Sequence, residues 1–357
     1  MTSLWSTVTG LPFWDAVFSF AVTFAILVIV HELGHYLAAR FHRMPVEEFA
    51  VGFGRKVAVL MRRGTTEYTL RALPLGGFVR VRGMEFENEA DPVEGEDGFN
   101  RRPVHQRFGV IVAGPLASLL LGYLAFVVLF MVFGTPTGRV RLETVVAGKP
   151  AERAGLRAGD VVVAVNGESV DPMAMVTAIE RSPGKAVRLE IERSGARQMV
   201  EVVPDAVPSG KESVGKIGVG PGTEMRPSGL GAAAREALRA TGRYFSMLGN
   251  IVRSGRAKEA VGGPVGIART FYDTAGSGME TRLQLMGSLS LSLFLFNVLP
   301  IPVLDGGQMM LLIVEAIRRR KLSADTMHRV HAAGLAVIGT LFVLVMFNDL
   351  TRWAGRH

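Results

Sequence analysis

His31 and His35 are four residues apart and enclose Glu32, which gives the pattern His-Glu-x-x-His. On a helix, residues at this spacing lie one turn apart on the same face, so both imidazoles can reach one Zn²⁺. Glu32 is then placed to take a proton from a water molecule whose pKa the metal lowers. The pattern therefore indicates hydrolytic zinc chemistry.

The setting of this motif is unusual, because it lies in the apolar segment Ala16–Ala39, whose only charged residue is Glu32. A charge at the centre of a membrane span costs roughly 2.5–3.5 kcal/mol on insertion scales, and such residues are usually functional. The alternative is a helix that carries two surface histidines and a solvated glutamate. The apolar segment argues against it and predicts chemistry within the bilayer or at its edge.

A zinc hydrolase needs a third protein ligand and an open position for water. The chain has no cysteine, so this ligand must be a histidine or a carboxylate. Asp305 lies in the string NVLPIPVLDGG, residues 297–307, whose two prolines break a helix in an apolar setting. Broken backbone at membrane depth is tolerated only where it is buried in protein or lines a cavity. We expect Asp305 to be the third ligand, with His328 and His331 as competing candidates.

The composition is that of a membrane protein with soluble parts, with 48% hydrophobic residues and a mean hydropathy of +0.29. Residues 1–15 contain no Lys or Arg, so the first apolar segment is expected to be a retained helix and not a cleavable signal peptide. Four segments are long enough to be spans: Ala16–Ala39, Phe108–Phe133, Leu283–Leu304 and Ala332–Phe347.

Lysine and arginine are concentrated after the first and third spans, which predicts that residues 41–107 and the loop near residue 320 are cytoplasmic. The long region 135–282 should then lie on the opposite side of the membrane. This topology accounts for much of the net charge of +8. Because the basic residues are scattered, no nucleic-acid partner is expected.

Residues 150–160, with the string PAERAGLRAGD, and the Val-Asn-Gly turn at 165–167 resemble a PDZ domain. Such modules bind extended peptides by adding a strand to a sheet edge, although a structural plug without a ligand is an alternative. Residues 231–252 form an amphipathic pattern that suits either a helix on the membrane surface or a helix packed on its neighbours.

The predicted fold class is a polytopic α-helical membrane protein of about four spans, with a small cytoplasmic β-sheet insertion and one extracytoplasmic PDZ-like α+β domain. The expected parts are the first transmembrane helix with the zinc motif (1–40), a cytoplasmic loop with a membrane-associated sheet (41–107), the second transmembrane helix (108–134), the PDZ-like domain (137–205), a linker with amphipathic helices (206–282), a third transmembrane region with a broken helix (283–316) and a fourth transmembrane helix (330–350).

Together, the HELGH motif, the NVLPIPVLDGG string and the intervening PDZ-like region resemble the site-2 protease family, and in particular its bacterial regulator-of-sigma-E protease branch. The resemblance covers nearly the whole chain. It implies that His31, His35 and Asp305 bind Zn²⁺, that Glu32 is the general base and that Asn297 holds the substrate backbone.

The resemblance also implies a zinc metalloendopeptidase of the bacterial cytoplasmic membrane, with its active site toward the cytoplasm. Its partners would be the lipid bilayer, single-span membrane protein substrates such as anti-sigma factors or signal-peptide remnants, and a peptide or protein ligand of the PDZ-like domain. Two departures are visible. Only one PDZ-like domain is present where well-known members carry two, and Gln308 follows the LDGG string where a histidine is common.

Two other functions are alternatives to proteolysis. A transporter could use His31, Glu32, His35 and Asp305 as a coupling-ion site, and a broken third span would suit it. The chain shows no inverted repeat, however, and has few spans. A membrane scaffold that acts only through its PDZ-like domain would have no use for an intact zinc motif.

Overall fold

The computed structural model describes residues 11–84, 98–209, 212–254 and 263–354. It divides into two compact units. One unit contains the chain up to Leu129 and from Ala234 onward, and the other contains Phe130–Ala233.

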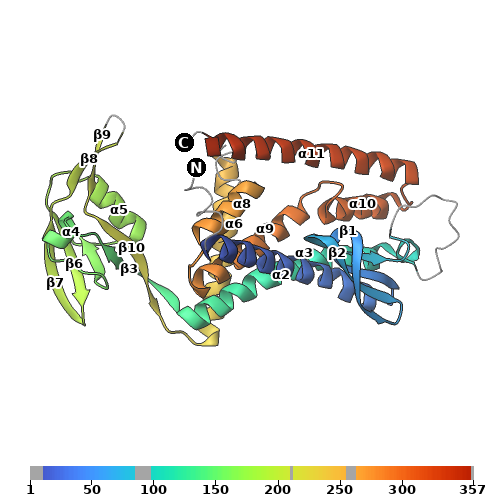
Figure 1. Cartoon of the computed structure of the whole chain (residues 1–357), viewed down its shortest axis with the longest axis horizontal. Helices are drawn as coiled ribbons and strands as arrows, with labels where there is room; N and C mark the ends of the chain where they lie inside the picture. Colours follow the sequence, from blue (N-terminus) through green and yellow to red (C-terminus); the bar gives the residue numbers. More distant parts are fainter. Residues whose placement is uncertain (1–10, 85–97, 210–211, 255–262, 355–357) are drawn as a thin grey trace. The chain divides into compact units, whose positions relative to one another are not determined.

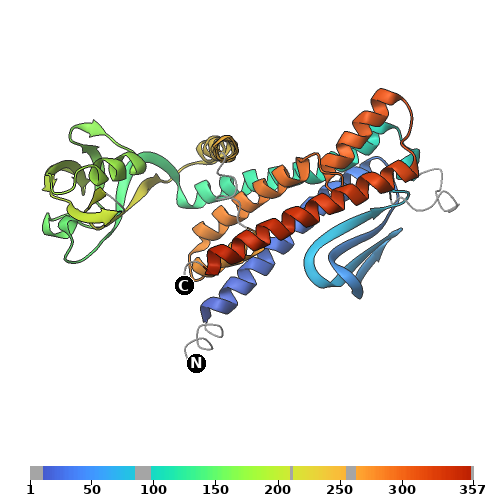
Figure 2. The same cartoon turned by 90° about the horizontal axis from the view of Figure 1, so that it is seen from above.

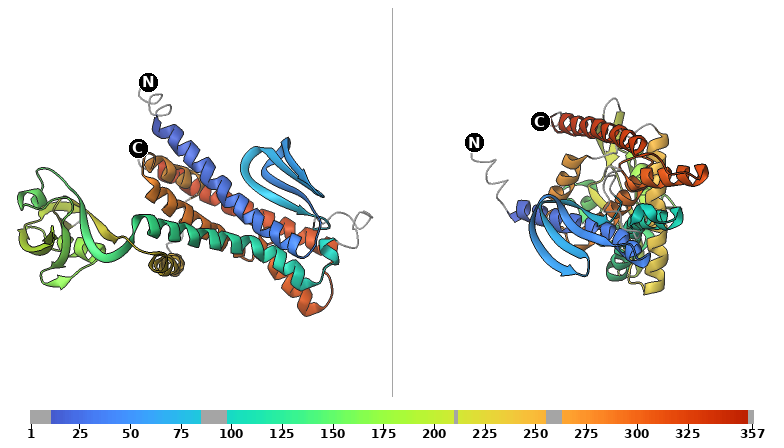
Figure 3. Two further views of the ribbon diagram at one scale, coloured as in Figure 1. Left: turned by 90° about the horizontal axis from the view of Figure 1, so that it is seen from below. Right: turned by 90° about the vertical axis from the view of Figure 1, so that its right-hand side faces the viewer.

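The first unit is built of long helices, and α2, α3, α9 and α11 run roughly along one another (Figures 1 and 3). The helices that belong wholly or mostly to this unit are α2 (Leu11–Phe41), α3 (Val104–Phe133), α6 (Leu230–Arg253), α8 (Pro264–Asp273), α9 (Met279–Val298), α10 (Asp305–Arg318) and α11 (Ala324–Ala354), with a short 3₁₀ turn at Phe99–Arg101.

Three helices in the described part of the chain are long and apolar enough to cross a membrane. They are Phe13–Phe41 in α2, Val104–Phe133 in α3 and Asp325–Thr351 in α11, with mean hydropathies of 2.2, 2.6 and 2.3. Their places correspond to the first, second and fourth expected spans. Helix α3 begins four residues before the expected boundary at 108, so Arg107 belongs to the helix.

The third expected transmembrane region is divided between α9 and α10, as the expected broken helix implies. Helix α9 carries Glu280 and Arg282 in its first turn, which lowers its hydropathy. Helix α10 has 14 residues, or about 21 Å at 1.5 Å per residue, against a hydrocarbon core of about 30 Å. Neither half has the length and hydropathy of a span among the described residues, so the count of four spans stays a prediction.

The break between α9 and α10 covers residues 299–304, where the two prolines predicted it. Two glycines let the backbone fold back tightly there. A Cβ atom at Gly306 would lie 2.3 Å from the carbonyl oxygens of Val298 and Leu299, and one at Gly307 would lie 2.2 Å from that of Ile301. The Gly-Gly pair therefore lets α10 start directly against the end of α9.

The cytoplasmic loop predicted after α2 contains two long, bent strands beside α2 (Figure 2). Residues 46–51 pair with residues 77–81, and residues 58–63 pair with residues 66–70 around the turn. The strands are β1 (Val46–Arg63) and β2 (Thr66–Val81). Both strands lie within residues 41–107, where the sheet is expected.

Helix α6 packs its small and aromatic side chains on the neighbouring helices. Ala233 and Ala237 are buried, the hydroxyl of Tyr123 donates to the carbonyl of Ala234 at 3.4 Å, and the rings of Phe245 and Phe294 lie 5.8 Å apart. Of the two interpretations of this amphipathic pattern, these contacts favour packing on α3 and α9.

The second unit is an antiparallel sheet in the order β10-β3-β4-β6-β7, with β5 beside β4. Its core includes the fully buried side chains of Leu142, Met175, Leu189 and Ile191. The elements are β3 (Thr135–Val145), α4 (Pro150–Arg153), β4 (Val161–Val165), β5 (Glu168–Ser169), α5 (Pro172–Glu180), β6 (Val187–Arg193), β7 (Ala196–Val202), β8 (Asp205–Ser209), β9 (Glu212–Lys216) and β10 (Val219–Arg226).

The expected end of this module at residue 205 is too early. Strand β10 pairs with β3 along its length, from Val219 opposite Val145 to Arg226 opposite Thr135, so it completes the sheet. Its sequence VGPGTEMR contains two glycines and a proline and does not alternate. Pairing with a strand distant in sequence, and not local pattern, makes this segment a strand.

Asp160 is a buried acid that ties this sheet together. Its carboxylate accepts hydrogen bonds of 2.7 Å from Nε and from Nη2 of Arg193, and one of 2.8 Å from the backbone N–H of Arg157. Burial acts to raise the pKa of Asp160, but these hydrogen bonds outweigh it, so the pKa lies below its usual value of 3.8.

We expect Asp160→Asn to lower the free energy of unfolding of this unit by about 2 kcal/mol or more, because it leaves Arg193 without its anionic partner. Hydrogen exchange of the β4 amides in the full chain measures the change. In the wild type, the depressed pKa makes this contribution fully present above pH 3.8 and lost as the pH falls below it.

The control is Asp205→Asn, which removes an exposed ion pair with Arg153 and should cost no more than about 1 kcal/mol. Equal losses in the two variants would contradict the role assigned to Asp160.

Candidate metal centre

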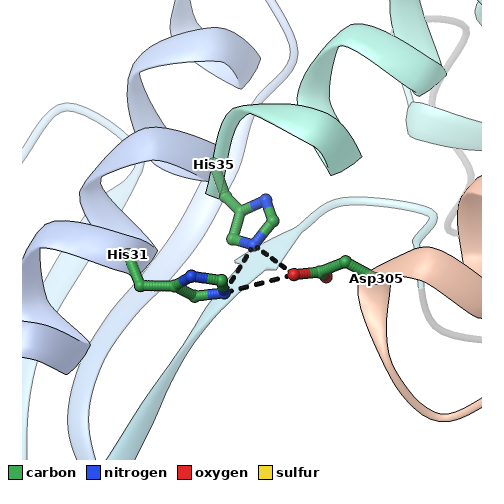
Figure 4. A group of neighbouring side chains, drawn as sticks. All are labelled: His31, His35 and Asp305. Carbon is green, nitrogen blue, oxygen red and sulfur yellow. Dashed lines mark hydrogen bonds and ion pairs between the residues drawn. The ribbon is translucent and has the colours of Figure 1, made fainter. Parts of the chain in front are cut away.

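The side chains of His31, His35 and Asp305 point toward one another (Figure 4). Oδ2 of Asp305 lies 3.2 Å from Nε2 of His31 and 3.5 Å from Nε2 of His35, and the two Nε2 atoms are 3.3 Å apart. Both histidines are buried, with 7% and 8% of their surface exposed. The structure thus brings Asp305 to two histidines that precede it by 274 and 270 positions in the chain.

Two helices supply the three side chains. His31 and His35 lie one turn apart on α2, and Asp305 is the first residue of α10, directly after the break. The N-terminal end of a helix carries a partial positive charge and favours a carboxylate. The break therefore places a negative side chain at a favourable helix end and opposite the two imidazoles.

Each imidazole has a hydrogen-bonding neighbour at its far side. Nδ1 of His35 donates to the backbone carbonyl of Val110 at 2.8 Å. Because a carbonyl can only accept, the proton of a neutral His35 sits on Nδ1 and the lone pair of Nε2 faces the cluster. Nδ1 of His31 lies 2.9 Å from the hydroxyl oxygen of Ser118, which can accept or donate.

The donor set fits a zinc ion. Oδ2 of Asp305 is buried and accepts no well-aligned hydrogen bond, although two imidazole nitrogens lie within 3.5 Å of it. Crowding of an anionic oxygen and imidazole lone pairs is unfavourable unless a cation sits among them. The nearest ligand atoms of the three residues all lie within 4.8 Å of one another. Two nitrogens and one carboxylate oxygen, with a fourth position open, make up a catalytic zinc site.

Helix α3 approaches this cluster closely because it has glycine at the point of contact. A Cβ atom at Gly114 would lie 2.1 Å from Nε2 of His35. On the opposite helix, a Cβ atom at Gly34 would lie 2.3 Å from the carbonyl oxygen of Ala113. Sequence reasoning missed the partners that α3 supplies. The available signal was the polar and small residues of A-G-P-L-A-S, residues 113–118, inside an apolar helix.

Glu32, the expected general base, faces the end of β2. A Cβ atom at Gly77 would lie 3.5 Å from Cγ of Glu32 and 2.9 Å from Val28. The backbone of Val79 is within hydrogen-bonding reach of the Glu32 carboxylate. The strand can therefore lie directly against the part of α2 that carries this carboxylate.

The remaining predicted residues lie outside the cluster of ligand atoms. Asn297 is half-buried one residue before the end of α9, and the contacts of the described residues do not place its amide at the cluster. Its role stays a prediction. His328 and His331 lie in the first turns of α11, where Nδ1 of His331 donates to the carbonyl of Met327 at 2.9 Å.

Comparison with known proteins identifies the family of this chain. The model of peptidase family M50 matches residues 19–341. The chain belongs to this family. It is similar to the zinc metalloprotease RasP of Geobacillus kaustophilus. The two sequences are 30% identical over an alignment that covers 95% of this chain and 98% of the relative. It is also similar to the regulator of sigma-W protease RasP of Bacillus subtilis, at 28% identity over an alignment that covers 95% of this chain and 99% of the relative.

A third relative, the putative zinc metalloprotease CPE1693 of Clostridium perfringens, is 32% identical over 92% of this chain and 96% of its own length. The expected family and enzyme class are confirmed. The chain is a zinc metalloprotease of a bacterial multi-pass membrane type, and Zn²⁺ is its expected cofactor. This class excludes the transporter and scaffold alternatives as the main function.

Among solved structures, the PDZ domain of an SdrC-like protein from Listeria innocua matches 23% of this chain and 92% of its own length, at 20% identity. Its TM-score of 0.21 is too low to decide the fold of the second unit.

We expect Gly114→Ala to weaken zinc binding by about 10-fold or more, because the new methyl group would lie 2.1 Å from Nε2 of His35 and displace the ring. Competition with a chromogenic chelator measures the affinity. The control is Gly109→Ala on the same helix, whose methyl group would lie 3.3 Å from Nε2 of His42 and should leave the affinity unchanged. Wild-type zinc affinity in Gly114→Ala would contradict this packing.

Proposed function

We propose that this protein is an intramembrane endopeptidase that hydrolyses peptide bonds within or near the transmembrane helices of single-span proteins. The observation that carries this proposal is the buried convergence of His31, His35 and Asp305 inside the apolar helical unit, with Glu32 beside a strand edge. A protease that acts on soluble substrates would not need its metal site enclosed by membrane-spanning helices.

Nε2 of His31, Nε2 of His35 and Oδ2 of Asp305 are the proposed zinc ligands. Bound Zn²⁺ would polarise the scissile carbonyl group and lower the pKa of the attacking water. The hydrogen bonds from the outer nitrogens to Ser118 and to Val110 keep both rings directed at the cluster.

Glu32 is the proposed general base. Its carboxylate accepts a proton from the attacking water and returns it to the nitrogen of the departing peptide. It lies one residue after the first ligand, on the side of α2 that meets β2. A peptide lying along this strand would therefore present its backbone to the carboxylate.

The end of β2 is the proposed docking edge for the substrate. A helical substrate must unwind first, because its carbonyl groups are engaged in its own hydrogen bonds. Residues 77–81 pair with β1 on one side, and an extended substrate could pair with the other. The exposed Phe53, Leu73 and Val57 give this sheet an apolar surface that suits a membrane segment. Asn297 would hold the substrate backbone from α9.

We place the active site toward the cytoplasmic side, because the Arg-rich segment 41–107 follows the zinc helix. The PDZ-like unit would then be extracytoplasmic and would dock a peptide or exclude large substrates. The name of the Bacillus subtilis relative, a regulator of sigma-W protease, supports a regulatory substrate such as an anti-sigma factor.

We expect Asp305→Ala to weaken zinc binding at least on the order of 100-fold, since loss of a direct ligand exceeds the 10–100-fold cost of losing an outer partner. Zinc content of the purified protein, measured by mass spectrometry, should fall from about one ion per chain to near zero. His331→Ala tests the competing ligand and should keep its zinc. Loss of zinc in His331→Ala and its retention in Asp305→Ala would make His331 the third ligand in place of Asp305.

We expect Glu32→Gln to retain zinc and to slow cleavage by a factor on the order of 10²–10⁴, the usual contribution of a general base. Cleavage of a single-span reporter in detergent or liposomes provides the rate. The control is Glu315→Gln on α10, the same chemical change at another carboxylate. It removes the partner of Arg107 and leaves the proposed base in place. Full activity in Glu32→Gln with zinc bound would refute the role of this carboxylate.

A further inference from the structure

We propose that Ser118 on α3 is a positioning residue that fixes the tautomer and ring orientation of His31. The proposal rests on the ligand set of the proposed function, because it concerns how one of those ligands is prepared for zinc. Its oxygen lies 2.9 Å from Nδ1 of His31.

The contact is enclosed on both sides. Ser118 is fully buried, and His31 is 7% exposed. Ser118 lies in the middle of α3, in a stretch that is apolar enough to span a membrane. A hydroxyl group in such a place needs a protein partner, because no water or polar lipid group reaches it. The imidazole of His31 supplies that partner.

The tautomer follows from the need to keep Nε2 free. If Nε2 of His31 is to bind a metal, the proton of the neutral ring must be on Nδ1, and a buried N–H needs an acceptor. The oxygen of Ser118 is that acceptor. His35 has the same arrangement, with the carbonyl of Val110 as its acceptor at 2.8 Å.

One face of α3 serves both ligands. Val110, Gly114 and Ser118 follow one another at four-residue spacing, so they lie on the same face of the helix. Val110 accepts from His35, Gly114 leaves room for the His35 ring, and Ser118 contacts His31. The two histidines are themselves four residues apart on α2. The matched spacing lets one helix orient both rings.

Helix α9 contacts α3 at Ser118. The hydroxyl of Ser290, also fully buried, donates to the backbone carbonyl of Ser118 at 2.7 Å. A Cβ atom at Gly122 would lie 2.8 Å from the side chain of Leu291, so the two helices are in close contact one turn further on. The contact between α3 and α9 therefore does not depend on the Ser290 hydroxyl alone.

The experiment compares zinc affinity in Ser118→Ala and Ser290→Ala, using full-length protein in detergent and competition with a chelator. Both changes remove one hydroxyl from a fully buried serine at the same helix contact. The hydroxyl of Ser118 contacts the imidazole of His31, whereas that of Ser290 donates to the backbone carbonyl of Ser118. We expect the zinc dissociation constant to rise 10–100-fold in Ser118→Ala and less than about 3-fold in Ser290→Ala.

A second measurement separates ring orientation from loss of packing. With Co²⁺ in place of zinc, the visible absorption band reports the ligand geometry, and it should shift or broaden in Ser118→Ala but not in Ser290→Ala. The melting temperatures of the two metal-free variants should be similar.

Three results would overturn the proposal. Wild-type zinc affinity in Ser118→Ala, with affinity lost in Asp305→Ala, rejects the role of Ser118 and leaves the proposed function intact. Equal losses in the two serine variants show that packing alone is responsible. Unchanged affinity in both Ser118→Ala and Asp305→Ala rejects the zinc site itself, and the role of Ser118 with it.

Discussion

Two imidazole nitrogens and one carboxylate oxygen face one another within 3.5 Å in a buried place, and much of the first unit is arranged around this contact. Imidazole lone pairs beside an anionic oxygen attract a cation. The surrounding helices restrain the three side chains in this arrangement. Glycine at the helix contact and outer hydrogen bonds to α3 provide that restraint.

The break between α9 and α10 is the main structural cost of this site. Breaking a helix in an apolar region leaves backbone groups without their usual partners. In return, the break places Asp305 at the start of a helix and opposite α2. Gly306 and Gly307 make this compatible with tight packing, and Gly334 of α11 contacts Pro302 at the break. The prolines break the helix, the glycines allow close packing, and together they set the position of Asp305.

The sheet and the second unit contribute differently to the proposed activity. The end of β2 touches α2 beside Glu32, so a strand edge and a candidate base belong to one contiguous site. The second unit has its own sheet and its own buried core.

Much of this protein was determined by sequence alone. The spacing of His31 and His35, the apolar segment around them and the proline-broken string before Asp305 predicted a cluster that the structure brings together, because each is a local pattern with a direct chemical meaning. Apolar runs predicted the places of α2, α3 and α11. Tertiary structure decided those features that depend on contacts between segments far apart in the chain. It made β10 a strand by pairing it with β3. It also brought Val110, Gly114 and Ser118 to the two histidines, because contacts between helices depend on how their faces meet in space and leave only faint traces in local sequence.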